Sequence, residues 1–312
     1  MRLLARRTDA TKPQPAIQRL SVALLTSALI SLCDNHANAA DKIEVVTSFS
    51  ILGDLTREVG GDRVAVTTIV MPNGDAHTFQ PTPADARRLG NAKVLVVNGL
   101  GLEGWMPRLQ QASGFNGVVV TASQGVKPLE MVQHGTKVTD PHAWQDLHNG
   151  KIYVANIRDG LTKADPDDNA TFQANAQKLT AEIDKLDAEV RDAIGKLPPE
   201  RRKIITTHRA FGYFGAAYGL EFIAPEGIST EGAPSAQDFA RIIRQIKSEK
   251  IPAVFLENVS DPRLLDQISS ETGAIVGGTL YSDSLSTSDG PAPTYLDMFR
   301  HNIRTLTSAL SK

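Results

Sequence analysis

The chain has 312 residues, of which 41% are hydrophobic and 22% are charged, and it contains a single cysteine. This apolar content suffices for packed cores, which excludes a wholly disordered chain, and the length favours two domains. Lysine and arginine number 33 against 35 aspartate and glutamate residues, so no basic excess points to nucleic acid as a partner. One cysteine excludes a disulfide framework and a zinc ribbon, so any metal must be bound by histidines and carboxylates.

The first segment, residues 1–39, has the pattern of a signal peptide. Basic residues precede an apolar run from Leu20 to Leu32, and Ala37-Asn38-Ala39 fits the small-residue cleavage rule. The run is too short to span a bilayer, which takes about 20 helical residues. A lipoprotein modified at Cys33 is disfavoured by the large Leu32 before it, and Arg6-Arg7 lies too far from the apolar run for a typical twin-arginine signal. We therefore expect cleavage and a protein located in the periplasm.

After the leader, short β-branched runs alternate with helical stretches. This alternation is typical of βαβ units and predicts a mostly parallel sheet in a first α/β lobe, residues 40–164. The expected strands are 43–48, 64–70, 93–98 and 118–121, and the expected helices are 51–59 and 83–89.

The alternation stops after about residue 160, where a single long helix is predicted. Apolar residues recur there at steps of three and four, namely Phe172, Ala176, Leu179, Ile183, Leu186, Val190, Ala193 and Leu197. The helix 170–197 would be about 42 Å long and would end at Pro198-Pro199. We interpret residues 165–199 as a linker helix between two lobes. A coiled-coil dimer arm is the alternative, but the heptads are few.

The second half returns to the alternating pattern. The expected strands are 203–206, 221–224, 253–257 and 274–280, and the expected helices begin at Ser235, Asp261 and Pro291. Ser235 with Asp238 three residues later forms a capping-box pattern. Residues 200–312 are thus predicted to form a second α/β lobe, which gives two α/β lobes joined by one long helix.

A glycine-rich segment, residues 98–104 (NGLGLEG), follows the strand 93–98 and matches the dinucleotide fingerprint. The match is weak, because no acidic residue lies near position 121 to bind a ribose. Glu103 also places a negative charge where a phosphate would bind. A tight strand-to-helix turn with Trp105 packed behind it is the simpler interpretation.

The histidines carry the stronger signal. Of the seven, His77, His142 and His208 lie in loops next to predicted strands or turns, where α/β proteins place their sites, and Asp283 follows the strand 274–280. These four residues are therefore candidate metal ligands, although each histidine alone could be an ordinary core or surface residue. Of the other histidines, His36 lies in the leader, and His134 and His148 are not assigned as ligands. His301 is expected at the surface of the last helix. No zincin or serine-hydrolase motif is present.

Several segments together resemble the solute-binding proteins of ABC metal-uptake systems, the cluster A-I or ZnuA-like group. The matching segments are 74–83 (GDAHTFQPTP), 98–105 (NGLGLEGW), 140–146 (DPHAWQD), 207–214 (THRAFGYF), 218–221 (YGLE), 233–236 (APSA) and 280–283 (LYSD). They occur in the family's order and span about residues 43–311. The resemblance implies two Rossmann-like α/β lobes bridged by one long helix, with a metal site between the lobes.

The resemblance also implies a ligand set and a function. His77 and His142 would come from the first lobe, and His208 and Asp283 from the second. The segment from Gln133 to Asp140 is short, with only His134, where many zinc carriers have a long histidine-rich loop. This is similar to the AztC-like subgroup, some members of which receive zinc from a periplasmic chaperone.

We therefore expect a monomeric binding protein, and not an enzyme, that binds one Zn²⁺ and delivers it to an inner-membrane ABC permease. Three imidazoles and one carboxylate suit tetrahedral Zn²⁺ and leave no open position for a reacting water. The alternatives are a manganese-binding protein of the same family and, from a different class, a periplasmic zinc hydrolase in which Asp283 would be a base.

Overall fold

The computed structural model describes residues 42–133, 135–232, 235–251 and 253–311, which belong to one compact unit. The predictions for the leader, including His36 and Cys33, and for His134 and residues 233–234 lie outside the described residues. Within the described ranges, no helix combines the length and the apolar character needed to cross a membrane.

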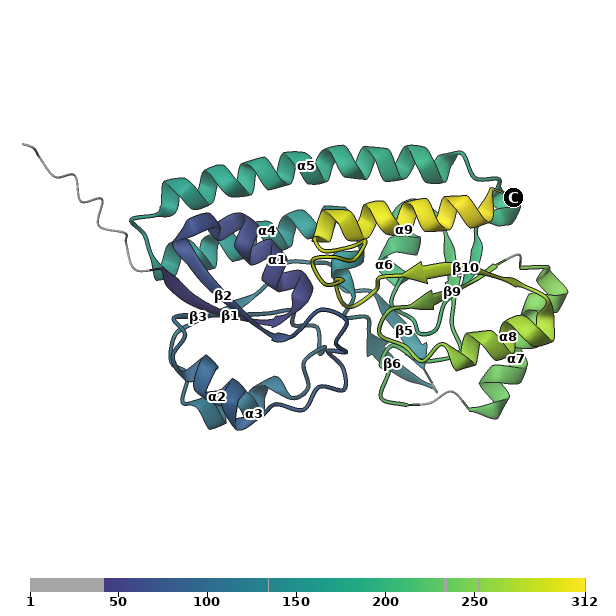
Figure 1. The fold of residues 1–312 in the computed structure, drawn as a ribbon, viewed down its shortest axis with the longest axis horizontal. Coiled ribbons are helices and arrows are strands. Elements are labelled where there is room, and N and C mark those ends of the chain that lie inside the picture. Colours follow the sequence, from purple (N-terminus) through teal and green to yellow (C-terminus); the bar gives the residue numbers. More distant parts are fainter. Residues whose placement is uncertain (1–41, 134, 233–234, 252, 312) are drawn as a thin grey trace, which may run out of the picture. The chain divides into compact units, whose positions relative to one another are not determined.

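The first lobe is built on a parallel sheet. Its strands are β1 (Ile43–Phe49), β2 (Val64–Val70), β3 (Val94–Val97) and β4 (Val118–Thr121), in the order β2-β1-β3-β4. Helices α1 (Ser50–Gly60) and α4 (Leu147–Ala164) lie on one face, and α2 (Pro83–Gly90) and α3 (Met106–Ser113) lie on the other (Figure 1). Helices on both faces explain why the strands are continuous apolar runs.

The second lobe repeats this scheme. Its strands are β7 (Lys203–Ile205), β8 (Glu221–Ile223), β9 (Ala253–Glu257) and β10 (Ile275–Leu280), all parallel in the order β10-β9-β7-β8. Helices α6 (Gly212–Tyr218) and α9 (Tyr295–Leu310) lie toward one face, and α7 (Ala236–Glu249) and α8 (Arg263–Thr272) toward the other (Figure 1). The predicted class, two α/β lobes with parallel sheets, is confirmed. Short 3₁₀ turns occur at Gly61–Arg63, Ala143–Gln145 and Pro199–Arg201.

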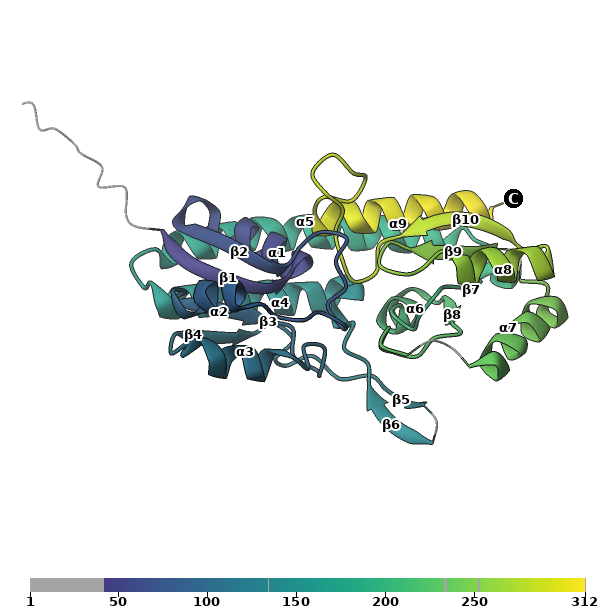
Figure 2. The same ribbon diagram turned by 60° about the horizontal axis from the view of Figure 1, so that its bottom comes forward.

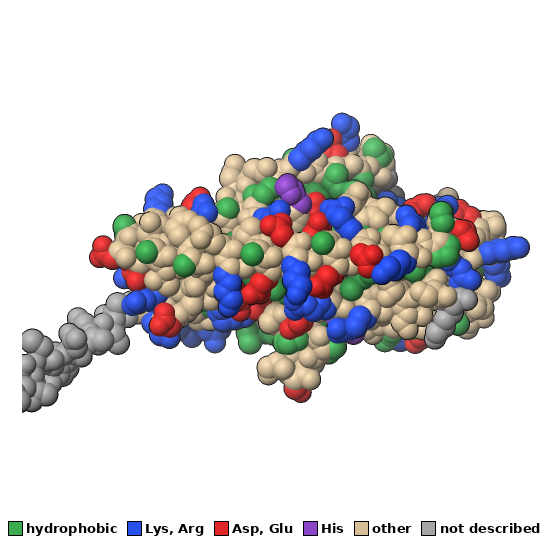
Figure 3. All heavy atoms as spheres, turned by 90° about the horizontal axis from the view of Figure 1, so that it is seen from above, with side chains coloured by type: hydrophobic (Ala, Val, Ile, Leu, Met, Phe, Trp, Pro, Cys, Tyr) green, Lys and Arg blue, Asp and Glu red, His purple; other side chains and the backbone are tan. Residues whose placement is uncertain are grey.

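The long helix is α5 (Asn169–Gly195), and it runs along both lobes (Figure 1). Its buried residues follow the predicted stripe, except that Ile194 is buried in place of Ala193 and the helix ends at Gly195, before Pro198-Pro199. The exposed side carries i,i+4 ion pairs, including Lys185–Glu189 and Asp187–Arg191. Charges of both signs are interspersed over the face seen from above (Figure 3).

Several elements are absent from the sequence-based prediction. Helices α3, α4 and α6 were not expected, nor was the antiparallel hairpin of β5 (Glu130–Gln133) and β6 (Thr136–Thr139). Figure 2 shows the hairpin extending away from the first sheet. The last helix begins at Tyr295, later than the predicted Pro291, because Thr294 caps it by accepting a hydrogen bond from the Asp297 amide.

The glycine-rich turn after β3 binds a carboxylate of its own chain. Gly99, Leu100 and Gly101 all have positive φ angles, which turns the chain sharply. Glu103 accepts hydrogen bonds from the Asn98 amide at 2.6 Å and from the Ser48 hydroxyl at 2.6 Å. The amides that a phosphate would need are therefore directed at this carboxylate, which agrees with the interpretation as a structural turn.

Two hydrophobic clusters hold the unit together. The larger one includes buried residues of both sheets and of α5, so α5 contributes to a core shared by the two lobes. The smaller one lies among β7, β9, α7 and α8. Side chains that are fully buried in the larger cluster include Trp144, Tyr153 and Phe299.

Candidate metal centre

The structure brings the four candidate ligands together. His77 lies in the loop after β2, His142 follows the β5–β6 hairpin, His208 follows β7 and Asp283 follows β10. One donor atom from each side chain lies within 4.8 Å of the donor atoms of the others. Three of these loops leave the carboxyl ends of parallel strands, which is where open α/β sheets place binding sites.

The distances between donor atoms fit a small coordination sphere. The His77 Nε2 atom lies 3.2 Å from His142 Nε2 and 3.3 Å from Asp283 Oδ2, and His208 Nε2 lies 3.0 Å from Asp283 Oδ2. Tetrahedral Zn²⁺, with bonds of about 2.0–2.1 Å, separates neighbouring donors by about 3.3 Å. The cluster can therefore surround one divalent cation.

The centre is shielded from solvent, and one acceptor in it has no partner. His142, His208 and Asp283 are fully buried, and His77 is 8% exposed. The Asp283 Oδ1 atom accepts no hydrogen bond from the described residues, and His142 Nε2 is 3.6 Å away, beyond hydrogen-bonding distance. A buried carboxylate oxygen without a donor is costly. A cation in the centre would remove that cost, so the donor set fits a metal.

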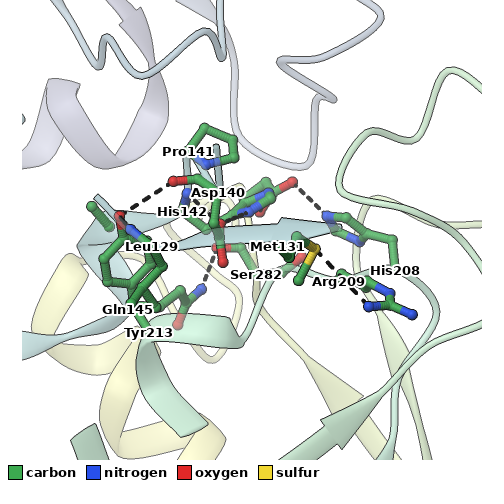
Figure 4. Close-up of polar contacts among 12 residues, drawn as sticks. Leu129, Met131, Asp140, Pro141, His142, Gln145, His208, Arg209, Tyr213 and Ser282 are labelled. Carbon is green, nitrogen blue, oxygen red and sulfur yellow. Dashed lines mark hydrogen bonds and ion pairs between the residues drawn. The ribbon is translucent and has the colours of Figure 1, made fainter. Parts of the chain in front are cut away.

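Carboxylates contact both histidines of the first lobe, one at its ring and the other at its backbone. The Asp140 carboxylate lies 2.7 Å from His142 Nδ1 and also accepts the His142 backbone amide (Figure 4). Asp75 accepts the His77 backbone amide at 2.8 Å. A carboxylate at Nδ1 favours the tautomer that leaves Nε2 free to bind a metal.

His208 has an equivalent support from the second lobe. Glu257, the last residue of β9, places Oε2 at 2.7 Å from His208 Nδ1. Its other oxygen accepts the backbone amides of Thr207 and His208 at 2.8 and 2.9 Å. This residue therefore contacts both the ring and the backbone of the candidate ligand His208.

The pKa values of the centre show that its charges are strongly coupled. Burial lowers the pKa of His142, but the carboxylates of Asp283 and Asp140 outweigh burial and raise it to about 9. Burial opposes charge on His208 too, yet Glu257 and Asp283 hold its pKa well above the usual value. Burial raises the pKa of Asp283, but the two histidines hold it well below its usual range. Opposite charges within the buried centre therefore stabilise one another despite their desolvation.

The loop that carries Asp283 is bound to the first lobe. The carbonyl oxygen of Ser282 accepts a hydrogen bond from Trp144 Nε1 at 2.9 Å. It also accepts one from Gln145 Nε2 at 2.6 Å (Figure 4). Both donors lie in the 3₁₀ turn directly after His142. The candidate ligands of the two lobes are therefore held next to each other through neighbouring residues.

The remaining described histidines lie apart from the centre. His148 is exposed in the first turn of α4, where its backbone amide is bound by Asp146. His301 was expected at the surface, but it is half-buried, and its Nε2 lies 2.9 Å from the Thr279 carbonyl oxygen. Neither belongs to the cluster of candidate ligands.

The supporting carboxylates were missed by the analysis of the sequence. Asp75 and Asp140 share a signal that could have revealed them, because each precedes its histidine by two residues in an Asp-x-His pattern. Glu257 has no such signal. It reaches His208 only because β9 pairs with β7 in the sheet, and that pairing cannot be read from local spacing.

Comparison with known proteins gives relatives along most of the chain. The chain is 34% identical over 271 residues to the manganese-binding lipoprotein MntA of Halalkalibacterium halodurans, and the match covers 86% of this chain and 89% of that protein. It is 35% identical over 278 residues to the iron-binding protein YfeA of Yersinia pestis, covering 88% of each.

A solved structure shows the same fold. The periplasmic zinc-binding protein TroA of Treponema pallidum is 31% identical and has a TM-score of 0.82, covering 87% of this chain and 100% of that one. These relatives are named as binding proteins for different metals, and none as an enzyme. The family model described as "Zinc-uptake complex component A periplasmic" matches residues 45–309. The chain therefore belongs to the ZnuA family of periplasmic metal-binding components of uptake systems, and it is a binding protein and not an enzyme.

Proposed function

We propose that this protein captures Zn²⁺ in the periplasm and delivers it to an ABC permease in the inner membrane. The observation that carries the proposal is the donor set, in which three imidazole nitrogens and one carboxylate converge in a buried centre. Imidazole suits zinc, whereas manganese prefers oxygen-rich sites of higher coordination. Zinc also exceeds manganese in intrinsic affinity for such ligands. His77, His142, His208 and Asp283 are the proposed ligands.

Metal analysis of the exported protein tests this proposal. The purified protein should contain one zinc per chain, and zinc should displace manganese from it in competition titrations. Substitution with Co²⁺ should give the absorption of a four-coordinate ion that added anions do not change. Stoichiometric manganese or iron, retained against equimolar zinc, would refute zinc as the cargo while leaving the binding site itself in place.

Manganese is the second candidate, and one observation favours it. Asp283 directs both carboxylate oxygens at the histidines, with Oδ2 near His208 and Oδ1 near His142, so it could bind a metal through two oxygens. Such binding gives more than four donors, which manganese accepts more readily than zinc. A hydrolase has no comparable support, because every proposed donor is supplied by the protein and the centre is buried.

We also propose that residues 1–39 are removed and that the mature protein is soluble. The support is the leader pattern, with its cleavage site at Ala37-Asn38-Ala39. The mature chain would then consist of a first lobe to residue 164, the linker region 165–199 and a second lobe from residue 200. Mass spectrometry of the exported protein should give a start at Ala40 or Asp41. A lipid-modified start at Cys33 would show a membrane-anchored form instead.

The proposed partners follow from the role in uptake. Besides the permease, we propose a periplasmic zinc chaperone as in the AztC-like subgroup, because the segment around His134 is short. The protein should behave as a monomer, since it supplies all four ligands from one chain. Sedimentation tests the oligomeric state. Transfer of zinc from a chaperone in the presence of a competing chelator tests the loading step.

A further inference from the structure

A groove lies between α2 and α3, outside the metal centre. The two helices lie side by side against the first sheet (Figures 1 and 2) and line a hollow of about 890 Å³. Its walls include Ala86, Arg87 and Gly90 of α2 and Arg108 and Ala112 of α3. Within each helix these positions follow helical spacing, so one face of each helix is directed at the groove.

The dimensions of the groove suit an extended chain. The helices touch where Gly90 meets Ser113, since a Cβ on Gly90 would lie 2.8 Å from the Ser113 carbonyl oxygen. Each helix has eight residues, which corresponds to a length of about 12 Å. An extended segment of about four residues, at about 3.3 Å per residue, has that length.

The chemistry of the groove is apolar at its base and positive along its walls. Trp105 and Leu109 are buried there and form an apolar base. Arg87 and Arg108 are exposed, one on each wall, and neither guanidinium has a hydrogen bond or ion pair with any described residue. The neighbouring Arg88, by contrast, pairs with Asp85 at 2.9 Å. No acidic residue lines the groove, so its charge is complementary to that of an anion.

We propose that this groove binds an acidic, extended peptide segment of a partner protein. Carboxylates of the segment would pair with Arg87 and Arg108, and an apolar side chain between them would pack on Trp105. A guanidinium can bind a carboxylate through two hydrogen bonds, which favours arginine at such sites. Two arginines on opposite walls can pair with two carboxylates that are separated by one residue of the same peptide. Gln80 and Asn91, exposed at the rim, can bind the peptide backbone.

The groove is connected to the metal centre through its base. Trp105 Nε1 donates a hydrogen bond to the Ala76 carbonyl oxygen at 2.9 Å, and Ala76 directly precedes His77. The Trp105 ring also packs on Phe79, with ring centroids 5.1 Å apart. A segment seated on Trp105 would therefore contact the residue that holds the His77 loop. This connection gives the groove a role in metal transfer only if the proposed function holds, whereas peptide binding itself does not depend on it.

Fluorescence anisotropy with a defined probe tests the proposal. The probe is a fluorescein-labelled peptide of alternating glutamate and leucine residues, and its control has glutamine in place of glutamate. The purified exported protein should bind the acidic probe saturably and at least tenfold more tightly than the control. Arg87→Glu and Arg108→Glu should each weaken binding at least tenfold. Lys127→Glu, the same charge change at an exposed loop residue of this lobe that does not line the groove, should not.

Tryptophan fluorescence, competition and zinc titration provide further tests of peptide binding in the groove. The acidic probe should change the fluorescence of Trp105, and this change should be lost in Trp105→Phe. The proposal is overturned by non-saturable binding, by equal affinity for the two probes, or by free glutamate competing as well as the peptide does. Zinc titration of Arg87→Glu and Arg108→Glu without peptide should match wild type. Loss of zinc binding in the wild-type protein would refute the proposed function and not the groove.

Discussion

We expect protons and a metal ion to compete for the imidazoles of the candidate centre. Without a metal, the carboxylates of Asp283 and Asp140 raise the pKa of His142 to about 9 despite its burial, so this ring is protonated at neutral pH. Only the neutral ring can bind a metal. Metal affinity should therefore fall as the pH decreases below about 9, and not only below the usual histidine value of 6.5.

The expected slope is about tenfold in apparent Kd per pH unit for each displaced proton. Zinc titrations between pH 6 and 10 with a pH-independent competitor measure this slope, and calorimetry in buffers of different ionisation enthalpy counts the released protons. An affinity that is constant from pH 7 to pH 9 would contradict the protonated state of His142.

Among the proposed ligands, His208 provides the sharpest test of metal choice. His208→Ala removes one nitrogen donor and should weaken zinc binding by at least about 100-fold, since even substitutions of residues that only support a ligand cost about 10–100-fold. His208→Glu adds oxygen donors and should narrow the preference for zinc over manganese. His148→Ala, at an exposed histidine outside the centre, is the matched control. Titration of zinc and of manganese into the three variants measures their affinities for each metal. A wild-type zinc affinity in His208→Ala would disprove the ligand assignment.

A buried carboxylate away from the centre should make stability depend on pH. Burial raises the pKa of Asp54 to about 6, although the Tyr295 backbone amide donates to it at 2.7 Å. A raised pKa means that the stabilising contribution is complete below pH 3.8 and is lost as the pH rises through about 6. At pH 7.5 the charged form should cost about 3 kcal/mol at most.

Asp54→Asn keeps an acceptor for the Tyr295 amide but cannot become charged. It should therefore increase the free energy of unfolding at pH 7.5 by about 1–3 kcal/mol and have little effect at pH 4. Asp167→Asn, at an exposed position, is the control and should change little at either pH. Urea unfolding at the two pH values measures the difference, and equal effects at both would show that Asp54 is not the titrating group.

At the scale of single elements, α5 supports the fold through its buried stripe. Ile183 is fully buried in the cluster shared by the two lobes. Ile183→Ala should lower the free energy of unfolding by about 2–5 kcal/mol, because it removes apolar contacts and leaves a cavity. Gln177→Ala, on the exposed side of the same helix, should stay within about 0.5 kcal/mol. Chemical denaturation of both variants tests whether α5 is part of the core or only a connection.

Two of the elements that the sequence analysis missed have weak local signals, each for its own physical reason. Helix α4 contains Gly150 and Gly160, which weaken helix propensity and hide its pattern. Both glycines are required by packing, since a Cβ at Gly150 would lie 2.6 Å from the Tyr295 hydroxyl and one at Gly160 would lie 2.1 Å from Val120. The β5–β6 hairpin is short, with strands of four residues. By contrast, α5 was predicted closely because its stripe repeats over seven turns.

The candidate ligands were predicted better than their surroundings. Loops at strand ends, together with the family resemblance, pointed to His77, His142, His208 and Asp283, and the structure brings these four together. Their role as metal ligands remains a proposal. Glu257 was missed because its position next to His208 depends on strand pairing in the second sheet. The groove between α2 and α3 was missed because the sequence did not predict helix α3.

At the scale of the whole described unit, hydrogen bonds link the lobes independently of a metal. Asp75 accepts from the Thr230 hydroxyl at 2.6 Å, and the Asn73 amide donates to the Leu285 carbonyl oxygen at 3.0 Å. The Ser50 hydroxyl accepts the Leu285 amide at 2.9 Å. Together with the shared core along α5, these contacts oppose a wide hinge motion.

Metal binding should therefore stabilise the protein strongly while changing its dimensions little. A metal that binds only the folded state adds about 4 kcal/mol to the free energy of unfolding at a thousandfold excess over Kd. His208→Ala should lose most of this gain, whereas Arg87→Glu, in the groove of α2 and α3, should keep it. Denaturation with and without zinc measures the stabilisation, and small-angle scattering measures the radius of gyration. A large decrease in radius on adding zinc would show that the lobes separate widely in the metal-free state, against the contacts that join them.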